Sequence, residues 1–481
     1  MYDLIVVGGG PAGVTAALRG RELGAAVALV ERHRMGGTCT NDGCVPTRVL
    51  AKAARLLRDA AQFDEYGLEI AAPVLDFERL MVRAQQVVYT IHEKKQLIDH
   101  LQRSGAEVFA ETGPARFLDP HTLLLPDGRR LEGAKIILAA GGRARRLDFP
   151  GAELTLTHSD VWSLKKPPAS LAIVGGAATG CQVASIFAAF GVRVTILERA
   201  AQILGTEDPA ITQLVADEFQ QRGIEMVTGI GDIEKIEKHA GRLAVHYLLD
   251  GSRQVLEAEA VMLSAGWVGN LADLNLAAAG VETAGPYVKV DDTLRTTAAH
   301  IFAAGDINGR MMLVQSAGSD AIVATENALL DARQAQKHTL VPHGGFTDPE
   351  YGSVGLTEAQ ARTAYDCAVT TVSYAEIDRA VIDGHTTGLC KLIVNRQTHQ
   401  ILGAHVVGEQ ALEIVHLAAA GMAAGMRIEQ LAALEIAYPT FTAILGLAAR
   451  RIVSDLGVRP LAPEWRALGR LPAAEWERRS D

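Results

Sequence analysis

The chain has 481 residues, of which 48% are hydrophobic and 21% are charged, and its formal net charge at pH 7 is -10. This length exceeds what a single hydrophobic core serves, and at roughly 150 residues per domain it predicts about three domains. The acidic balance, with no long basic run, argues against a nucleic-acid surface and leaves small molecules as the expected partners.

The N-terminus and the cysteine content bear on the compartment. The chain enters a buried strand at once, without the charged region and cleavage site of a signal peptide. No apolar run approaches the roughly 18 residues that a membrane span needs. Five cysteines in a chain of this length do not make a secreted disulfide framework. We therefore expect a cytoplasmic protein with no membrane partner, in which a close cysteine pair is catalytic.

The N-terminal segment has the pattern of a dinucleotide-binding unit. A strand pattern precedes the G-x-G-x-x-G turn of Gly8, Gly10 and Gly13, and a helix and a second strand follow it up to Glu31. Such glycines let the backbone approach a pyrophosphate at the helix N-terminus, and the acid accepts hydrogen bonds from ribose hydroxyls. The alternative is a tight turn that binds no nucleotide, but the preceding strand and the placement of the acid favour binding.

A second unit of the same kind follows the first. Its turn contains Gly175 and Gly180, with Ala177 in place of the middle glycine, and its second strand ends at Glu198. A carboxylate there suits a ribose 2′-OH and repels a 2′-phosphate, which favours NAD over NADP, although Arg199 beside it weakens this preference. The alternative is a decayed structural copy. Two units in one chain predict a resident redox cofactor and an exchanging nucleotide.

Two cysteines with four residues between them follow the first unit. A bridge between Cys39 and Cys44 closes so small a ring that it would contribute only about 2 kcal/mol, so redox chemistry is the stronger interpretation. Helical spacing of apolar residues predicts helices over 49–66, with Pro46 near its start, and over 77–105. Cys44 therefore lies close to a helix N-terminus, where the dipole and free N–H groups favour a thiolate.

The C-terminal third changes pattern. Strands over 390–394 and 401–407 and an apolar helix over 411–424 predict a separate α+β domain. Cys181, Cys367 and Cys390 lie in apolar contexts and are expected to be ordinary buried residues. The histidines show no metal-ligand spacing, so no resident metal site is predicted.

These motifs, in this order, resemble those of the flavoprotein disulfide reductases, the family of lipoamide dehydrogenase, glutathione reductase, mercuric reductase and soluble transhydrogenase. The resemblance runs from Met1 to about Gly457 and rests on the following motifs: the turns at 8–13 and 175–180, Gly36-Gly37-Thr38-Cys39 with Cys44-Val45-Pro46-Thr47, Phe302-Ala303-Ala304-Gly305-Asp306, and Phe346-Thr347-Asp348-Pro349-Glu350.

The resemblance implies an α/β fold with two Rossmann-like dinucleotide-binding domains and a C-terminal α+β domain that forms a homodimer. The implied boundaries are 1–147 for the FAD-binding domain, 148–268 for the NAD(P)-binding domain, 269–340 for a central segment that completes the FAD site, 341–460 for the dimerisation domain and 461–481 for a tail.

The resemblance also implies roles for single residues. FAD binds the first unit with Asp306 near its ribityl chain, and a nicotinamide nucleotide binds the second unit. Hydride passes from the nicotinamide to the flavin and on to the disulfide, with Cys44 as the charge-transfer thiolate and Cys39 as the thiol that attacks the substrate. Further residues implied in cofactor binding are Gly37, Thr38, Gly141, Gly266 and Met312.

Two departures from the family lie near the expected flavin. Arg48 stands where relatives have a lysine, and Gln182 stands where they have a glutamate. In relatives those two residues can pair beside the flavin. The loss of both implies one rearranged contact and altered electrostatics around the cofactor.

The C-terminal acid–base element departs as well. Tyr438 and Ala443 stand where lipoamide and glutathione reductases carry a histidine and a nearby glutamate. General acid–base help is worth about 10²–10⁴-fold, so we expect poor turnover of dihydrolipoamide. Tyr438 is either a replacement acid or a residue that packs the dimer groove.

Three other functions stay open. Metal-ion reduction is possible because soft thiolates suit soft ions, but Thr440 replaces a tyrosine of mercuric reductases, and no cysteine pair follows Cys390. A flavin-only transhydrogenase or quinone reductase would leave Cys39 and Cys44 as bystanders. A redox-sensing binding protein would use the same scaffold without turnover.

Overall fold

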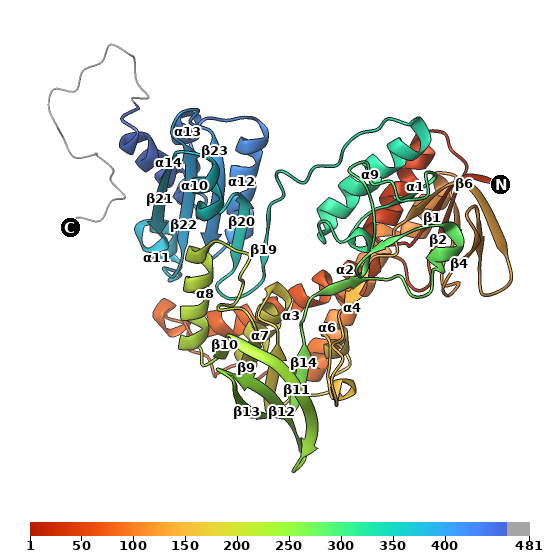
Figure 1. Ribbon diagram of the computed structural model, residues 1–481. Coiled ribbons are helices and arrows are strands. Elements are labelled where there is room, and N and C mark those ends of the chain that lie inside the picture. Colours follow the sequence, from red (N-terminus) through yellow and green to blue (C-terminus); the bar gives the residue numbers. More distant parts are fainter. Residues whose placement is uncertain (459–481) are drawn as a thin grey trace.

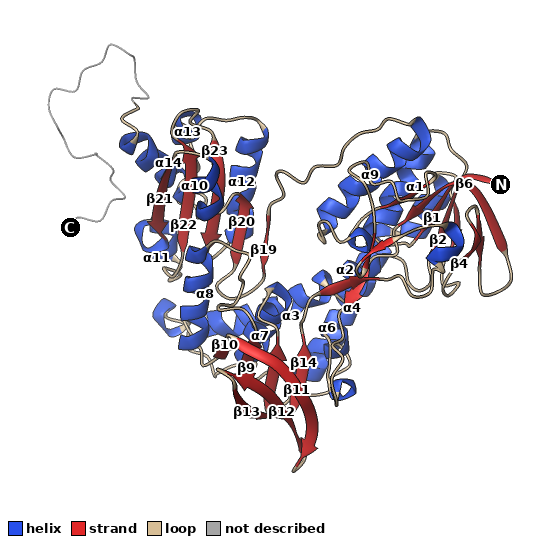
Figure 2. Cartoon of the chain, in the orientation of Figure 1, coloured by secondary structure: helices blue, strands red, loops and turns tan. Residues whose placement is uncertain are grey.

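The computed structural model describes residues 1–458, and the expected tail at 461–481 lies outside the described residues. The described chain forms three bodies, with the first near the N-terminus, the second below it and the third before the C-terminus (Figure 1). Helices and strands are mixed in each body (Figure 2). Between residues 1 and 458, no helix is both long and apolar enough to cross a membrane.

The first body is built on a sheet whose parallel strands are buried on both faces. Helices α1 (Pro11–Glu22) and α9 (Val314–Leu330) pack against each other beside it. A late segment joins this sheet, since β18 pairs with β6. The parallel strands, in spatial order, are β3 (Glu107–Phe109), β2 (Val27–Val30), β1 (Tyr2–Val7), β6 (Arg130–Leu138) and β18 (Ile301–Ala303), and β5 (Thr122–Leu124) and β4 (Arg116–Asp119) extend it antiparallel. Ligands of such sheets bind at the carboxyl ends of the parallel strands.

The second body repeats this plan. Helices α7 (Ala178–Ala189) and α8 (Pro209–Gln221) accompany a parallel sheet, and a short ladder between β7 (Gly142–Ala144) and β15 (Trp267–Gly269) connects the two units. The short helix α6 (His158–Val161) precedes the sheet. The parallel strands, in spatial order, are β10 (Glu225–Thr228), β9 (Arg193–Glu198), β8 (Ser170–Val174) and β14 (Ala260–Leu263). A separate antiparallel sheet consists of β11 (Ile230–His239), β12 (Arg242–Leu249) and β13 (Ser252–Ala258).

The third body is an antiparallel sheet with helices, as the sequence pattern predicts. Its strands in spatial order are β19 (His343–Gly345), β20 (Tyr351–Gly355), β23 (Ile401–Val407), β22 (Leu389–Asn395) and β21 (Cys367–Ser373), and its helices are α10 (Glu358–Ala364), α11 (Asp378–Ile382), α12 (Ala411–Ala423), α13 (Ile428–Ala432) and α14 (Ala443–Asp455). Cys367 and Cys390 are buried here and Cys181 is buried in α7, which confirms the prediction for these cysteines.

The helices around the cysteine pair differ from their predicted bounds. Cys39 lies in α2 (Gly37–Asn41), and the helix expected over 49–66 is α3, Cys44–Ala60. It starts earlier because Pro46 belongs to its first turn, where a missing N–H costs little. The helix expected over 77–105 is interrupted at Gln96, whose φ of 42° is left-handed, and divides into α4 (Phe77–Lys95) and α5 (Leu97–Arg103).

Helix α3 is joined to the third body by buried charge. Glu350 is 3% exposed and accepts from Arg55 at 2.5 Å and from Arg48 at 3.2 Å. The backbone N–H of Leu412 also donates to it, at 3.1 Å. Several donors therefore compensate a carboxylate that is almost fully removed from water.

A second carboxylate extends this contact by one helical turn. Arg58 of α3 reaches Asp348 at 2.8 Å and Glu409 at 3.1 Å. Arg222, which follows α8, also contacts Asp348. Burial opposes the charge of Asp348, but the two arginines outweigh it and lower the pKa of its carboxyl group. The motif at 346–350 is thus held by arginines from both dinucleotide-binding units.

We predict that Arg55→Ala lowers the free energy of unfolding by about 3 kcal/mol, the low end for breaking a buried pair, because Arg48 remains. A melting temperature at least about 5 °C below wild type is expected in a thermal scan. Arg253→Ala is the control, since this side chain is 79% exposed in its pair with Glu234. Equal melting temperatures for the two variants would show that the buried network does not stabilise the fold.

Candidate active site

A cavity of about 1830 Å³ lies between the bodies and is lined by residues of all three. It gathers most of the sequence-predicted site residues, from segments far apart in the chain. The predicted residues that line it are Gly8, Gly10, Glu31, Gly37, Thr38, Cys39, Cys44, Gly141, Gln182, Gly266, Asp306 and Met312. The predicted residues outside its lining are Gly13, Arg48, Gly175, Gly180, Glu198 and Tyr438.

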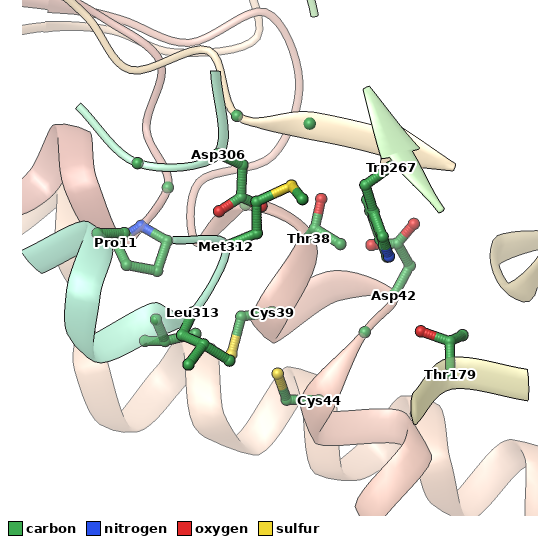
Figure 3. Close-up of a pocket in the computed structure, with 18 of the residues that line it drawn as sticks. Pro11, Thr38, Cys39, Asp42, Cys44, Thr179, Trp267, Asp306, Met312 and Leu313 are labelled. Atoms are coloured by element: carbon green, nitrogen blue, oxygen red, sulfur yellow. The ribbon is translucent and has the colours of Figure 1, made fainter. Parts of the chain in front are cut away.

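The two cysteines occupy neighbouring helix ends with their sulfur atoms turned toward each other (Figure 3). Both are free thiols, and Cys44 is the first residue of α3. A hydrogen bond from Cys39 lowers the pKa of Cys44 to about 7, against the opposing effect of burial, and the backbone N–H at the helix start adds to the lowering. The same hydrogen bond and burial raise the pKa of Cys39. Cys44 is therefore the thiolate of the pair.

The turn of the first unit is compact where it packs and open where it meets the cavity. A Cβ at Gly13 would lie 1.7 Å from the carbonyl oxygen of Gly8, which excludes every other residue. A Cβ at Gly10 would meet only the Cα of Gly37, at 3.6 Å. Within the described chain, α1 has no capping side chain and no acid in its first turn, so its N–H groups are available to a phosphate.

Glu31 is fixed at the end of β2 by the turn itself. Its carboxylate accepts the N–H of Gly9 at 2.6 Å and the N–H of His33 at 2.7 Å. The side chain is 9% exposed and lines the cavity. This position suits a carboxylate that accepts ribose hydroxyls next to a phosphate-binding helix end.

Two polar side chains that a ligand could hydrogen-bond face the same cavity. The Oδ1 of Asn270 is buried and accepts no hydrogen bond from residues 1–458. Asp306 lies beside Met312 and Thr38 (Figure 3), and burial raises the pKa of its carboxyl group. A polyhydroxylated ligand would satisfy both groups, because buried acceptors need donors. The lining therefore fits the ribityl chain and the dinucleotide of FAD.

The second unit has the same local construction. Glu198 accepts the N–H of Gly176 at 2.5 Å and the N–H of Ala200 at 2.6 Å. Ala177 precedes α7 with φ of -80°, which any residue adopts, so alanine fits at this position of the motif. Helix α7 likewise has no capping side chain or first-turn acid among the described residues. The unit retains the features of a nucleotide site and is not a decayed copy in its geometry.

Arg48 and Gln182 meet at Phe346 of the third body. The guanidinium of Arg48 lies 4.1 Å from the centre of the Phe346 ring, and the amide oxygen of Gln182 accepts the N–H of Phe346 at 3.1 Å. Arg48 also pairs with Glu350, as described above. The positive charge is thus directed to Phe346 and Glu350 of the third body, and Arg48 itself does not line the cavity.

Tyr438 lies on the third body, away from the cysteines of its own chain. Its side chain is 54% exposed, and its hydroxyl donates to Asp378 of α11. The residue does not line the cavity formed by the described chain. A contact of Tyr438 with a cysteine pair therefore requires a second subunit.

Comparison with known proteins identifies the family. The family model described as pyridine nucleotide-disulphide oxidoreductase matches residues 2–321, and the model of its dimerisation domain matches residues 341–449. The chain belongs to the pyridine nucleotide-disulphide oxidoreductase family. Its members are flavoenzymes that use FAD and NAD(P)H, which confirms the expected fold class, enzyme class and cofactors.

Relatives within this family differ in activity. A mercuric reductase of Staphylococcus aureus is 30% identical over 95% of this chain and 83% of its own length. A dihydrolipoyl dehydrogenase of Bacillus subtilis is 31% identical over 86% of this chain and 90% of its own length. The solved Cu(II) complex of the HOCl-induced flavoprotein disulfide reductase RclA from Escherichia coli covers 94% of this chain and 99% of its own, with a TM-score of 0.83 and 28% identity.

Sequence reasoning missed several lining residues of this oxidoreductase. Asn270 follows β15 and carries no motif of its own, and its orphaned oxygen is visible only in three dimensions. Asp42 lies between the two cysteines, and an acid at this place in a redox loop could have been recognised from the sequence. Its hydrogen-bond partners, Ser159 and Trp162, are more than a hundred residues away, so no local sequence pattern predicts them.

We predict that alkylation of Cys44 by iodoacetamide in the reduced protein is half-maximal near pH 7, because the thiolate is the nucleophile. In Cys39→Ala the hydrogen bond is lost, and the midpoint should move up toward the ordinary value of about 8.5. Mass spectrometry of the labelled peptide measures both. Buried Cys181 is the internal control and should stay unlabelled. An identical midpoint in Cys39→Ala would refute the assigned cause.

We predict that Glu198→Gln raises the ratio of kcat/KM for NADPH over NADH by about tenfold, because the variant keeps a hydrogen-bond acceptor but loses the charge that repels a 2′-phosphate. Steady-state rates with each nucleotide measure the ratio. Glu31→Gln, with the same geometry in the first unit, is the matched control. It should weaken FAD retention and leave the nucleotide ratio unchanged; equal ratios in both variants would contradict the assignment.

Proposed function

We propose that this chain is an NAD(P)H-dependent reductase in which electrons reach a Cys39–Cys44 disulfide through FAD and pass to a disulfide or another thiol-reactive acceptor. The observation that carries the proposal is the cysteine pair, with Cys44 at the start of α3, its pKa lowered to about 7, and its sulfur facing Cys39 inside the cavity. A stabilised thiolate next to a second thiol is the feature of a redox couple and not of two packed cysteines.

The residues of both nucleotide sites have separate tasks. The start of α1 holds the pyrophosphate of FAD, Glu31 accepts from its ribose, and Asp306 accepts from its ribityl hydroxyls. Bound FAD supplies the carrier that takes hydride from NAD(P)H and delivers two electrons to the disulfide. The start of α7 and Glu198 hold the nicotinamide nucleotide. The segment around Met312 and Leu313 covers Cys39 from the side of the first body (Figure 3).

The thiols complete the reaction on the protein. Two electrons break the Cys39–Cys44 bond and leave Cys44 as a thiolate and Cys39 as a thiol. Cys39 attacks an acceptor disulfide and expels one thiol, and Cys44 then attacks Cys39 and releases the second. The sum is NAD(P)H, one proton and a disulfide converted to NAD(P)+ and two thiols.

The acceptor side departs from the dihydrolipoyl dehydrogenases. Tyr438, hydrogen-bonded to Asp378, and Ala443 occupy the positions at which the resemblance places a histidine and a glutamate. Without an imidazole, protonation of a leaving thiolate near pH 7 loses its usual agent. We infer poor activity with dihydrolipoamide. We also infer that Tyr438 of a second subunit is the residue whose chemistry comes closest to that of the missing acid.

A homodimer and a reducing compartment belong to the same proposal. The dimerisation-domain match at 341–449 supports the dimer, and exposed apolar side chains of Val381, Ile382 and Leu434 lie on that body. We infer a cytoplasmic location from the cysteine usage, since five cysteines in a chain of this length do not make the disulfide framework of a secreted protein.

Metal-ion reduction is the second candidate. It is favoured by the two facing thiols of Cys39 and Cys44 (Figure 3), because soft sulfur ligands select soft ions. The matched relatives support it too, since one is a mercuric reductase and one structure is a Cu(II) complex. Here the ion is the substrate, held by Cys39 and Cys44.

We predict a long-wavelength thiolate–flavin absorbance when the holoenzyme is titrated anaerobically with NADH, and its loss in Cys44→Ser. Turnover with glutathione disulfide, lipoamide, mercuric ion, cupric ion and a quinone under one set of conditions then identifies the acceptor. Cys39→Ser should lower turnover of the true acceptor by at least about 10³-fold, as for loss of a nucleophile. Unchanged turnover in both variants would refute the proposal and favour flavin-only chemistry.

A further inference from the structure

The loop between the two cysteines is held by hydrogen bonds from a distant segment of the chain. Asp42 lies two residues before Cys44, and its carboxylate accepts a hydrogen bond from the hydroxyl of Ser159 at 2.6 Å. Its backbone carbonyl accepts from the indole Nε1 of Trp162, also at 2.6 Å. Both donors belong to α6 or to the residue directly after it. A segment more than a hundred residues away therefore holds the centre of the redox loop.

One peptide unit of this loop is held on both sides. Trp162 binds the carbonyl of Asp42, and the N–H of Gly43, in the same peptide unit, donates to the carbonyl of Thr38 at 2.7 Å. A peptide unit is planar, so two opposed hydrogen bonds determine its orientation. The next residue is Cys44, the first residue of α3, so the peptide unit held in this way lies directly before the start of the helix.

The support itself is anchored in a core. Val161 of α6 is 3% exposed and belongs to the same hydrophobic cluster as Leu50 and Ala51 of α3. Trp162 packs against this cluster from its edge. Trp162 and the helix that begins at Cys44 therefore share one packed interior, which allows little motion of one relative to the other.

His158 contributes less to this support. Its Nε2 lies 4.0 Å from the Asp42 carboxylate, and its ring packs on Trp267 with centroids 4.7 Å apart. Burial lowers the pKa of His158, so its charge is disfavoured near pH 7. The direct hydrogen bonds of Ser159 and Trp162 remain as the principal fastenings, and that of Trp162 is the less exposed.

We propose that Asp42 is a positioning residue, fastened by Ser159 and Trp162, that holds the redox loop in the conformation in which Cys39 and Cys44 face each other. The inference rests on the proposed function, because it needs the two cysteines to form a redox couple. Its consequence is a higher effective concentration of one thiol toward the other, and so a more stable disulfide. A loosened loop lets the thiols separate, and the disulfide becomes easier to reduce.

The test is the redox equilibrium of the pair in the purified holoenzyme. Wild type, Trp162→Phe, Ser159→Ala and Ser163→Ala are equilibrated anaerobically in glutathione buffers, quenched by alkylation, and the reduced fraction of Cys39 and Cys44 is measured by mass spectrometry. Trp162→Phe removes the indole N–H and leaves a smaller aromatic ring in its place. Ser163→Ala is the matched control, since Ser163 is exposed next to Trp162 and its hydroxyl donates within its own segment, to the carbonyl of Asp160.

We expect the equilibrium constant for disulfide formation to fall about tenfold in Trp162→Phe, which corresponds to about 30 mV. Ser159→Ala, with its more exposed bond, should show about a threefold fall, and Ser163→Ala should stay within about twofold of wild type. Equal constants in all four proteins would overturn the inference and leave the proposed function intact. Absence of any Cys39–Cys44 couple in wild type would overturn the proposed function, and this inference with it.

Discussion

The structure depends on how α3 is held at its two ends. Its first residue is the redox cysteine Cys44, and its later turns present Arg48, Arg55 and Arg58 to buried carboxylates of the third body. Loss of a partner from such pairs destabilises the fold, because a carboxylate as buried as Glu350 is costly when it is less well compensated. The network therefore fixes the helix that begins at Cys44 against the dimerisation domain.

The two nucleotide-binding units share one local arrangement of turn and glutamate. In each unit a glutamate at the end of the second strand accepts the N–H of a turn glycine, through Glu31 in the first and Glu198 in the second. The same bond closes the turn and places a charge where a ribose binds. Because the same hydrogen bond closes the turn in both units, the sequence motif is a reliable guide to this local geometry.

The sequence predicted the parallel sheets, the separate C-terminal α+β body and part of the cavity lining, because these rest on local periodicity and on short motifs. It misjudged the start of α3, since Pro46 in the first turn of a helix resembles Pro46 just before one. It did not foresee that Arg48 turns to Phe346 and Glu350, or that Trp162 fastens Asp42. Those contacts join residues more than a hundred positions apart, and only the packing of the bodies brings them together.

The acceptor half is constrained by proton supply. Each disulfide reduced consumes one proton, and a thiol leaves faster when its own pKa is lower. With Tyr438 and Ala443 in place of a histidine and a glutamate, an acceptor that expels an alkyl thiol of ordinary pKa lacks assistance at neutral pH. Acceptors that expel an acidic thiol, or soft metal ions that need no proton at all, escape this limit. On the proposed function, the missing dyad favours the acceptors that make the least demand on acid catalysis, and this chemistry separates the proposed activity from that of the dihydrolipoyl dehydrogenases.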